Sequence, residues 1–208
     1  MLERWSKSGA VSRMKTRRLT KPDYDEIVRE IDRWWGGPTT ALAHPMFYYE
    51  LGDLARVVED AGTMVGFLFG FLCPDGKTGY IHLVGIHPDY RRRGVARMLY
   101  TAFEDDCRHA AYKRLRAITT PGNEASIAFH HALGWTSTEV DDYAGPGRRR
   151  IVFTKVLPPG LPRCAARYPP RLVARESDRE PEGFPFRSLR PARCELWRKT
   201  SLGCPSWR

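Results

Sequence analysis

The sequence lacks several features that would place it in a class at once. No apolar run approaches the roughly 20 residues that a membrane-spanning helix needs, and the five cysteines include no CxxC pair of the kind that binds zinc. The first stretch is polar and has no central apolar run, so it does not read as a secretory signal. We therefore expect a cytoplasmic protein with no metal site and no contact with a membrane.

Acidic residues are fewer than basic ones, and the excess of basic residues is unevenly distributed along the chain. The formal net charge is +10, and eleven basic against five acidic residues lie from Leu157 onward. The remaining +4 is ordinary for a soluble domain. A basic balance favours an acidic partner such as a phosphate-bearing cofactor, a nucleic acid or a membrane surface. Because no zinc-finger or helix-turn-helix signature accompanies it, nucleic acid is an unlikely partner.

Composition divides the chain into three parts. Residues 1–13 are polar and irregular, whereas residues 14–157 alternate apolar patterns with turn signals. Residues 158–208 hold nine of the sixteen prolines and show neither helical nor strand periodicity. Such a segment cannot bury enough apolar surface to offset its ordering entropy. We predict one folded domain over 14–157, between a flexible N-terminal extension and a disordered tail.

Within 14–157 the patterns predict the order β-α-α-β-β-β-α-β-α-β-β. Ile27, Ile31, Trp34 and Trp35 recur at helical spacing and mark the inner face of the first helix. The residue pair at 61–62, Ala-Gly, joins two strands into an antiparallel hairpin. The second of these strands, "TMVGFLFGFLC", is apolar on both faces, which is typical of a strand in the middle of a sheet.

The stretch "VGIHPDYRRRGVARML", residues 84–99, places three arginines where a strand passes into a helix. A helix that begins near Gly94 presents main-chain N–H groups without intrahelical partners, and this is a ready site for phosphate. Glycine lets an anion approach the main chain closely, and Ala96 keeps the next position small. On these residues alone a solvated basic turn stays equally open.

A second motif lies about thirty residues downstream. Residues 91–96 read R-x-x-G-x-A, and "NEASIAFHHALGW" occupies 123–135. The combination resembles the GCN5-related N-acetyltransferase superfamily at Arg91, Gly94, Ala96, Asn123, Ser126, Phe129, Gly134 and Trp135. The resemblance covers about residues 14–157. It implies an α+β fold with a central, mostly antiparallel, twisted sheet of about seven strands, a V-shaped splay between the fourth and fifth strands, and about four flanking helices.

The resemblance implies that acetyl-coenzyme A is the cofactor. The pyrophosphate would meet main-chain N–H groups around Gly94, and the pantetheine arm would pair with the edge of the fourth strand, because its amides match an open strand edge. The side chain of Asn123 would contact the arm, although a helix-cap role explains it equally well. The implied cofactor-binding residues are Val84, Gly85, Ile86, Arg91, Arg92, Arg93, Gly94, Val95, Ala96, Arg97, Asn123, Ser126 and Phe129.

The resemblance also implies an enzyme, an acyltransferase that moves the acetyl group directly from the thioester to an amine. It leaves the acceptor open, and we expect the primary amine of a small molecule. The family often has Tyr at the position of His130, where it protonates the departing thiolate. His130 could keep that role as general acid, or it could simply pack in the helix. In "YIHLVGI", alternation puts His82 on one face with Tyr80 and Val84, where it could act as the base or be a core histidine.

The acceptor side is expected to involve aromatic residues. Trp34, Trp35, Phe47 and Tyr48 could wall a substrate pocket, and packing in the core is the alternative. Tyr143 lies in the loop of the last two strands and is a further catalytic candidate. Two other functions stay open: a non-catalytic sensor or scaffold module that binds acyl-coenzyme A, and an acetyltransferase acting on protein N-termini or lysines. Dimers are common in the superfamily, so a homodimer also stays open.

Overall fold

The computed structural model describes residues 14–158, so the predictions for the N-terminal extension and for almost all of the tail lie outside the described residues. The helices and strands follow the predicted order. They are β1 (Lys15–Arg18), α1 (Lys21–Trp35), η1 (Thr40–Leu42), α2 (Met46–Tyr49), η2 (Gly52–Leu54), β2 (Arg56–Asp60), β3 (Thr63–Leu72), β4 (Thr78–Ile86), η3 (Pro88–Tyr90), α3 (Val95–His109), β5 (Arg114–Thr119), α4 (Glu124–Ala132), β6 (Thr136–Val140) and β7 (Arg150–Val156).

The strands form one sheet in the order β1-β2-β3-β4-β5-β7-β6. Every neighbouring pair is antiparallel except β4 and β5, which run parallel. The apolar strand β3 lies in the interior of this sheet, as its pattern predicts, and the second helical region consists of the two short helices η1 and α2. The predicted α+β fold with a mostly antiparallel sheet is confirmed.

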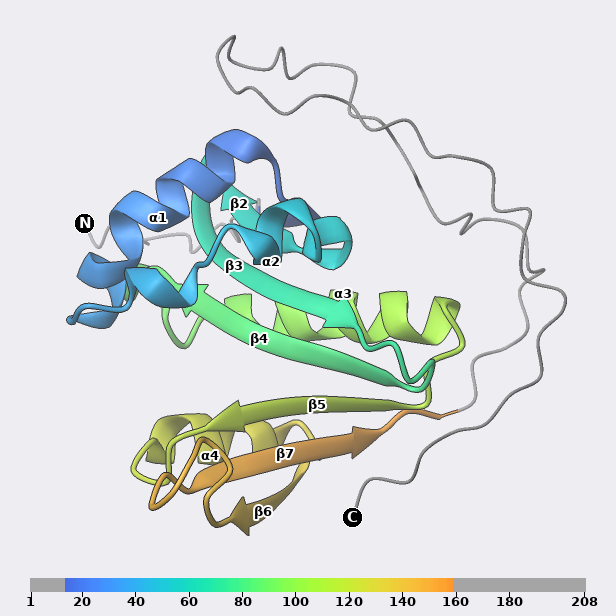
Figure 1. Ribbon diagram of the computed structural model, residues 1–208. Helices are drawn as coiled ribbons and strands as arrows, with labels where there is room; N and C mark the ends of the chain where they lie inside the picture. The colour runs from blue at the N-terminus through green and yellow to red at the C-terminus, as the bar shows by residue number, and fades with distance from the viewer. Residues whose placement is uncertain (1–13, 159–208) are drawn as a thin grey trace, which may run out of the picture. The chain divides into compact units, whose positions relative to one another are not determined.

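The parallel pair separates part of the way along its length. The last paired residues are Ile81 of β4 and Ala117 of β5, although β4 continues to Ile86 and β5 to Thr119. In Figure 1 the two strands are close at one end and diverge toward their arrowheads. The predicted splay is therefore confirmed. Beyond Ile81, the edge of β4 that is turned toward β5 pairs with no strand in the described part of the chain, while the other edge stays paired with β3.

A β-bulge in β4 changes which side chains share a face. Pairing with β3 passes from Leu83 opposite Phe69 to Ile81 opposite Gly70, so His82 is the extra residue. An extra residue interrupts the alternation of a strand. His82 and Leu83 consequently both pack on the side of α1 and α2, and Val84 packs on the side of α3. The expectation that His82 and Val84 share a face is wrong for this reason.

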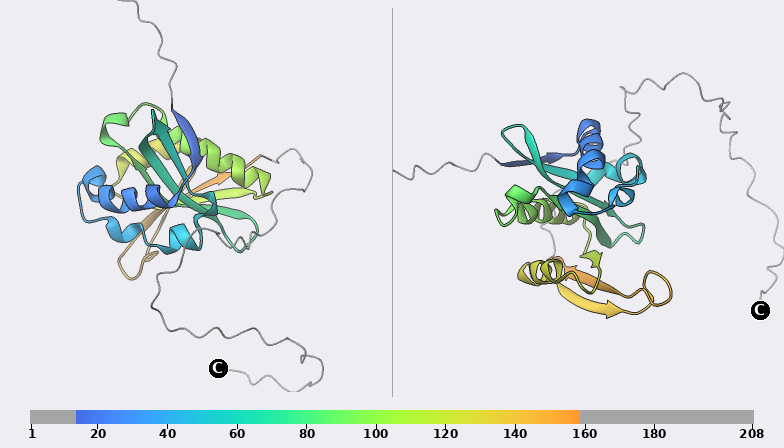
Figure 2. Two further views of the ribbon diagram at one scale, coloured as in Figure 1. Left: turned by 90° about the horizontal axis from the view of Figure 1, so that it is seen from above. Right: turned by 90° about the vertical axis from the view of Figure 1, so that its left-hand side faces the viewer.

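The helices lie on both faces of the strands β2 to β4. Helices α1 and α2 pack on one face and α3 on the other, as the view from above in Figure 2 shows. Glycines of the sheet let α3 approach the main chain: a Cβ at Gly66 would lie 2.6 Å from Val95, and one at Gly79 would lie 2.4 Å from the sulfur of Cys107. This close packing fixes the first turn of α3 beside the open end of β4.

Candidate active site

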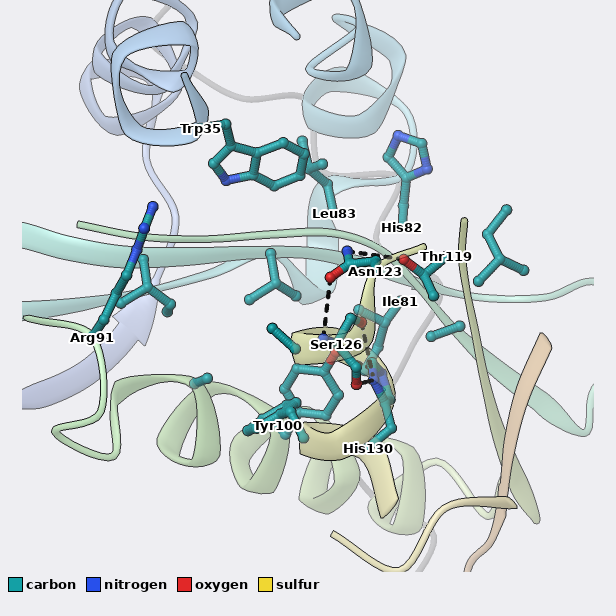
Figure 3. A pocket seen from close by; sticks show the side chains of 17 residues that line it. Trp35, Ile81, His82, Leu83, Arg91, Tyr100, Thr119, Asn123, Ser126 and His130 are labelled. Atoms are coloured by element: carbon teal, nitrogen blue, oxygen red, sulfur yellow. Dashed lines mark hydrogen bonds between the residues drawn. The ribbon is translucent and has the colours of Figure 1, made fainter. Parts of the chain in front are cut away.

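A cleft of about 510 Å³ opens where β4 and β5 part (Figure 3). Trp35, His82 and Leu83 lie on one side of the β4 edge, and Tyr100, Ser126 and His130 lie on the other. Among the described residues no carboxylate lines it. The lining residues are Trp35, Ile81, His82, Leu83, Val84, Ile86, Arg91, Ala96, Tyr100, Ala117, Ile118, Thr119, Asn123, Ala125, Ser126, Phe129 and His130.

A second cavity of about 270 Å³ lies at the N-terminus of α3. Its walls include Arg92, Gly94, Val95 and Arg97, and it shares Ile86, Arg91, Ala96 and Phe129 with the cleft. Arg92 and Gly94 have left-handed backbones, with φ of 61° and 85°. Alternating backbone handedness can turn successive N–H groups toward one point and create an anion site. The positive end of the helix dipole adds to the attraction.

The three arginines of the turn make different contacts. The Arg91 guanidinium donates a hydrogen bond of 2.5 Å to the carbonyl oxygen of Trp34 and so holds the last turn of α1. The Arg93 guanidinium lies over the Tyr90 ring, 5.1 Å from its centre. Arg93 and Gly85 line neither cavity among the described residues. The positive charge that faces the two cavities comes from Arg91, Arg92 and Arg97.

Asn123 joins the end of β5 to the start of α4. Its Oδ1 accepts a hydrogen bond of 3.1 Å from the main-chain N–H of Ser126, which caps the helix. Its Nδ2 donates to the Thr119 hydroxyl at 3.1 Å. Asn123 also lines the cleft, so the cap and the cleft position predicted from the sequence occur together.

His82 lies on the α1 and α2 side of the cleft, with its ring 3.6 Å from that of Phe47 and nearly parallel to it. Its Nε2 is 3.0 Å from the carbonyl oxygen of Leu42. Because a carbonyl oxygen only accepts, Nε2 carries the hydrogen and Nδ1 keeps the lone pair. Burial lowers the pKa of His82, so the ring is neutral near pH 7 and able to accept a proton.

His130 lies on the opposite side and is 4 % exposed. Its Nδ1 is 2.8 Å from the carbonyl oxygen of Ser126, and its Nε2 is 3.0 Å from the hydroxyl oxygen of Tyr100. Burial lowers the pKa of His130 and raises that of Tyr100. Tyr100 was not predicted from the sequence. The available signal is its place on the buried stripe of α3, where a phenol needs a hydrogen-bond partner.

The aromatic residues predicted for the acceptor side separate into two groups. Trp35 lines the cleft, and Phe47 lies against His82. Trp34 and Tyr48 are buried in the core beneath α1 and α2, where they do not line the cleft. Their expected place in a pocket wall is corrected, because the inner stripe of α1 and the turn of α2 face the sheet.

Tyr143 is 41 % exposed in the loop between β6 and β7 and is outside the cleft lining. It lies next to Tyr80, whose pKa burial and this neighbour raise to about 12. Within residues 14–158, no three His, Cys, Asp or Glu side chains gather as a metal site would require. No helix in that range is long and apolar enough to cross a bilayer.

The fold and the cleft are those of an N-acetyltransferase. The model of the acetyltransferase (GNAT) family matches residues 13–135, more than half of the sequence. The chain belongs to this family, as its motifs predict. An acetyltransferase of Yersinia pestis strain Pestoides F is 28% identical over 144 residues, which cover 67% of this chain and 97% of the relative.

Solved structures share the fold. The ribosomal-protein-S18-alanine N-acetyltransferase of Escherichia coli has a TM-score of 0.57 at 19% identity, and the match covers 69% of this chain and 94% of that one. The yncA acetyltransferase of Salmonella typhimurium, solved with acetyl-CoA, has a TM-score of 0.55 at 22% identity. That match covers 70% of this chain and 95% of that one.

Proposed function

We propose that the protein transfers an acetyl group from acetyl-coenzyme A to the primary amine of a small molecule. The observation that carries this proposal is the continuity of two features. The unpaired edge of β4 borders the cleft of about 510 Å³, and the cleft shares four lining residues with the cavity at the N-terminus of α3. A long cofactor with a diphosphate at one end and amides along its arm fits such a path.

The residues along this path fit the parts of acetyl-coenzyme A. The N–H groups at the start of α3, with Arg92 and Arg97 beside them, suit the diphosphate. The main chain of Val84 to Ile86 suits the two amides of pantetheine, because an extended chain can add to an open sheet edge as a further strand. This order brings the thioester to the β4 bulge, between His82 and Tyr100.

The side of the cleft near α1 and α2 suits an acceptor molecule that carries a single amino group on an apolar moiety. Trp35 and the His82–Phe47 stack offer flat apolar surfaces, and a cation can rest against the indole face. Because the described lining holds no carboxylate, a polyamine with several charges would lose water there without gaining ion pairs. The size of the cleft is in the usual range for small-molecule sites.

The chemistry needs a base on the acceptor side, because an ammonium has no lone pair with which to attack the thioester. The free Nδ1 of neutral His82 can take that proton. The new amide forms as the C–S bond breaks, and the oxyanion that develops in between needs an N–H donor. The unpaired main chain of β4 beside the thioester supplies such donors.

The test is release of free thiol from acetyl-coenzyme A across a panel of amines. The panel contains aryl-alkyl amines, polyamines, aminoglycosides and peptides with free N-termini, and product mass identifies the acetylated compound. We expect turnover with a small apolar amine. Turnover only with peptides would favour a protein acceptor, as in the S18 enzyme of Escherichia coli. Binding of acetyl-coenzyme A without turnover on any amine would indicate a sensor.

A further inference from the structure

The ring of His130 has hydrogen-bond partners at both nitrogens. Ser126 presents a carbonyl oxygen to Nδ1 at 2.8 Å, so Nδ1 carries a hydrogen and donates it. Nε2 then holds the lone pair, and it accepts the hydroxyl hydrogen of Tyr100 across 3.0 Å. In this neutral arrangement the phenol hydrogen points at the imidazole, and neither group offers a hydrogen to the cleft.

Packing holds His130 in this place. Its ring stacks on Phe153 with 3.8 Å between the centres and 6° between the planes. The ring of Trp135 meets it edge-on, with 5.2 Å between the centres. A side chain stacked in this way on one face and bounded on an edge cannot swing outward without opening the core. His130 therefore reaches a substrate through Tyr100, which also lines the cleft.

A single added proton reverses this hydrogen bond. If Nε2 becomes protonated, it donates to the hydroxyl oxygen of Tyr100, and the phenol hydrogen is released toward the cleft. Tyr100 lies on the same helix as the proposed diphosphate site, on the side of the β4 edge opposite His82 (Figure 3). An acid in this place faces the leaving sulfur when the amine enters from the His82 side.

We propose that Tyr100 and His130 form a two-residue proton relay, in which Tyr100 protonates the departing sulfur of coenzyme A and His130 resupplies Tyr100. The inference rests on the proposed function and adds a catalytic residue, Tyr100, to it. His130 is then a positioning and proton-supplying residue. It is not the group that contacts the sulfur.

The proposed relay delivers one proton to the sulfur in each turnover. The C–S bond breaks and the sulfur keeps the electron pair. The Tyr100 hydroxyl gives its proton to the sulfur and receives the Nε2 proton of protonated His130, whose ring returns to the neutral form with hydrogen on Nδ1. One proton from solution restores the pair. The acceptor loses two protons between the ammonium and the amide, both through His82 to solution, and the relay takes up one, so each turnover releases one proton.

The surroundings of His130 favour its neutral form, so the protonated ring is expected to exist only transiently. The ring is surrounded by Ser126 of α4, Tyr100 of α3, Phe153 of β7 and Trp135, which directly precedes β6. The titratable groups near it in the described residues are Tyr100 itself and His131, which disfavours the charged ring. No carboxylate holds His130 in the charged form, so burial favours its return to neutrality after each transfer.

The first test compares Tyr100→Phe with Tyr24→Phe. The Tyr24 hydroxyl is also buried and donates to the carbonyl oxygen of Ala43 at 2.9 Å, but it lies outside the cleft. We expect Tyr100→Phe to lower kcat about 100-fold, with the KM for acetyl-coenzyme A changed less than about twofold, a factor worth about 0.4 kcal/mol. Tyr24→Phe is expected to keep the wild-type kcat, which separates loss of the relay from loss of a buried hydrogen bond.

The second test is chemical rescue. His130→Ala leaves a space beside Tyr100, and added imidazole is expected to restore kcat at least tenfold in that variant. The same imidazole is expected to restore nothing in the double variant that also carries Tyr100→Phe. His130→Phe keeps the stack on Phe153 without the nitrogens, and it is expected to lose the fall of kcat that the relay produces as the pH rises through the lowered pKa of His130.

The outcomes separate the two proposals. If the wild type acetylates an amine and Tyr100→Phe has the same kcat and pH profile, the relay is wrong and the transferase stands. Equal rescue in the single and double variants would contradict it in the same way. If the wild type releases no thiol with any amine, the proposed function and the relay both fall.

Discussion

The two sides of the cleft differ in what they contribute. The β4 side offers main-chain atoms along an unpaired edge, and the histidine that β4 contributes to the cleft, His82, is held against Phe47. The α3 and α4 side offers the Tyr100 hydroxyl and the His130 imidazole, joined in a hydrogen-bond chain that starts at the Ser126 carbonyl oxygen. Main-chain groups are the same whichever residue supplies them, whereas the proposed chemical steps depend on particular side chains.

The difference predicts that the largest effect comes from the one side chain that acts on the β4 side. Replacing His82 by Gln keeps a polar group near the Leu42 carbonyl but removes the basic nitrogen. We expect kcat to fall about 100-fold, because the amine then loses its proton only to solvent. The measurement is kcat against pH with the best amine of the panel.

The shape of that profile is a control. Burial lowers the pKa of His82, so the acid limb of the wild-type profile lies below about pH 6.5. The limb is expected to vanish in His82→Gln. A variant with the same limb as the wild type would show that another group is the base.

The next effect concerns the main chain at the start of α3. Gly94→Ala is expected to weaken coenzyme A binding about tenfold, near 1.4 kcal/mol, because the added methyl occupies the space through which the diphosphate approaches. Gly62→Ala is the matched control. Gly62 has a φ of 86° against 85° for Gly94, and at both positions a Cβ would meet nothing within 4 Å.

Calorimetric titration and thermal unfolding of both variants separate the causes. A left-handed alanine costs about 1–2 kcal/mol of stability at either position. We expect similar losses of stability in the two variants and loss of affinity in Gly94→Ala alone. Equal affinities would mean that the anion does not approach this turn.

A smaller effect is expected at Arg91, which joins the two sides. Arg91→Ala removes a hydrogen bond from a charged donor to the Trp34 carbonyl, worth about 1.5–3 kcal/mol, and one positive charge from the cleft. We expect the KM for acetyl-coenzyme A to rise about fivefold, near 1 kcal/mol, more at low salt than at high salt. Arg149→Ala, which breaks an exposed pair with Glu139, is expected to change neither quantity measurably.

The smallest effect is a change of stability with pH. The pKa of His130 is lowered in the folded state, so the unfolded chain binds more protons below about pH 6.5. Its contribution to stability is complete above that pH and is lost as the pH falls. Chemical unfolding at pH 7.5 and 5.5 is expected to show a smaller loss on acidification for His130→Phe than for the wild type. An unchanged loss would mean that His130 is already charged in the folded protein.

The sequence predicted the fold well because its signals are local. The apolar strand at 63–72, the turn at 61–62 and the cap before α4 each depend on neighbouring residues alone, and they agree with the resemblance to the family. The cavity at the start of α3, where we propose the anion site, also lies where one strand, one turn and one helix start predict it. Local patterns therefore sufficed to predict where the proposed cofactor site begins.

The arrangement of the side chains around His82 and His130 was not predicted from the sequence, because it depends on contacts between distant segments. The bulge in β4 depends on the pairing of this strand with β3. Alternation alone predicted that His82 and Val84 share a face of the sheet, and the bulge puts them on opposite faces. The partnership of Tyr100 with His130 joins residues thirty positions apart on two helices. Trp34 and Trp35 are adjacent in sequence, and only packing decides which of them is buried.

The most direct test of the central claim is a crystal structure of the protein with coenzyme A. We expect the diphosphate within hydrogen-bond distance of the main-chain nitrogens at the start of α3, and the pantetheine amides paired with β4 between Val84 and Ile86. Its sulfur is predicted to lie next to the Tyr100 hydroxyl. A cofactor bound elsewhere, or a turn around Gly94 that faces only solvent in the complex, would contradict the account.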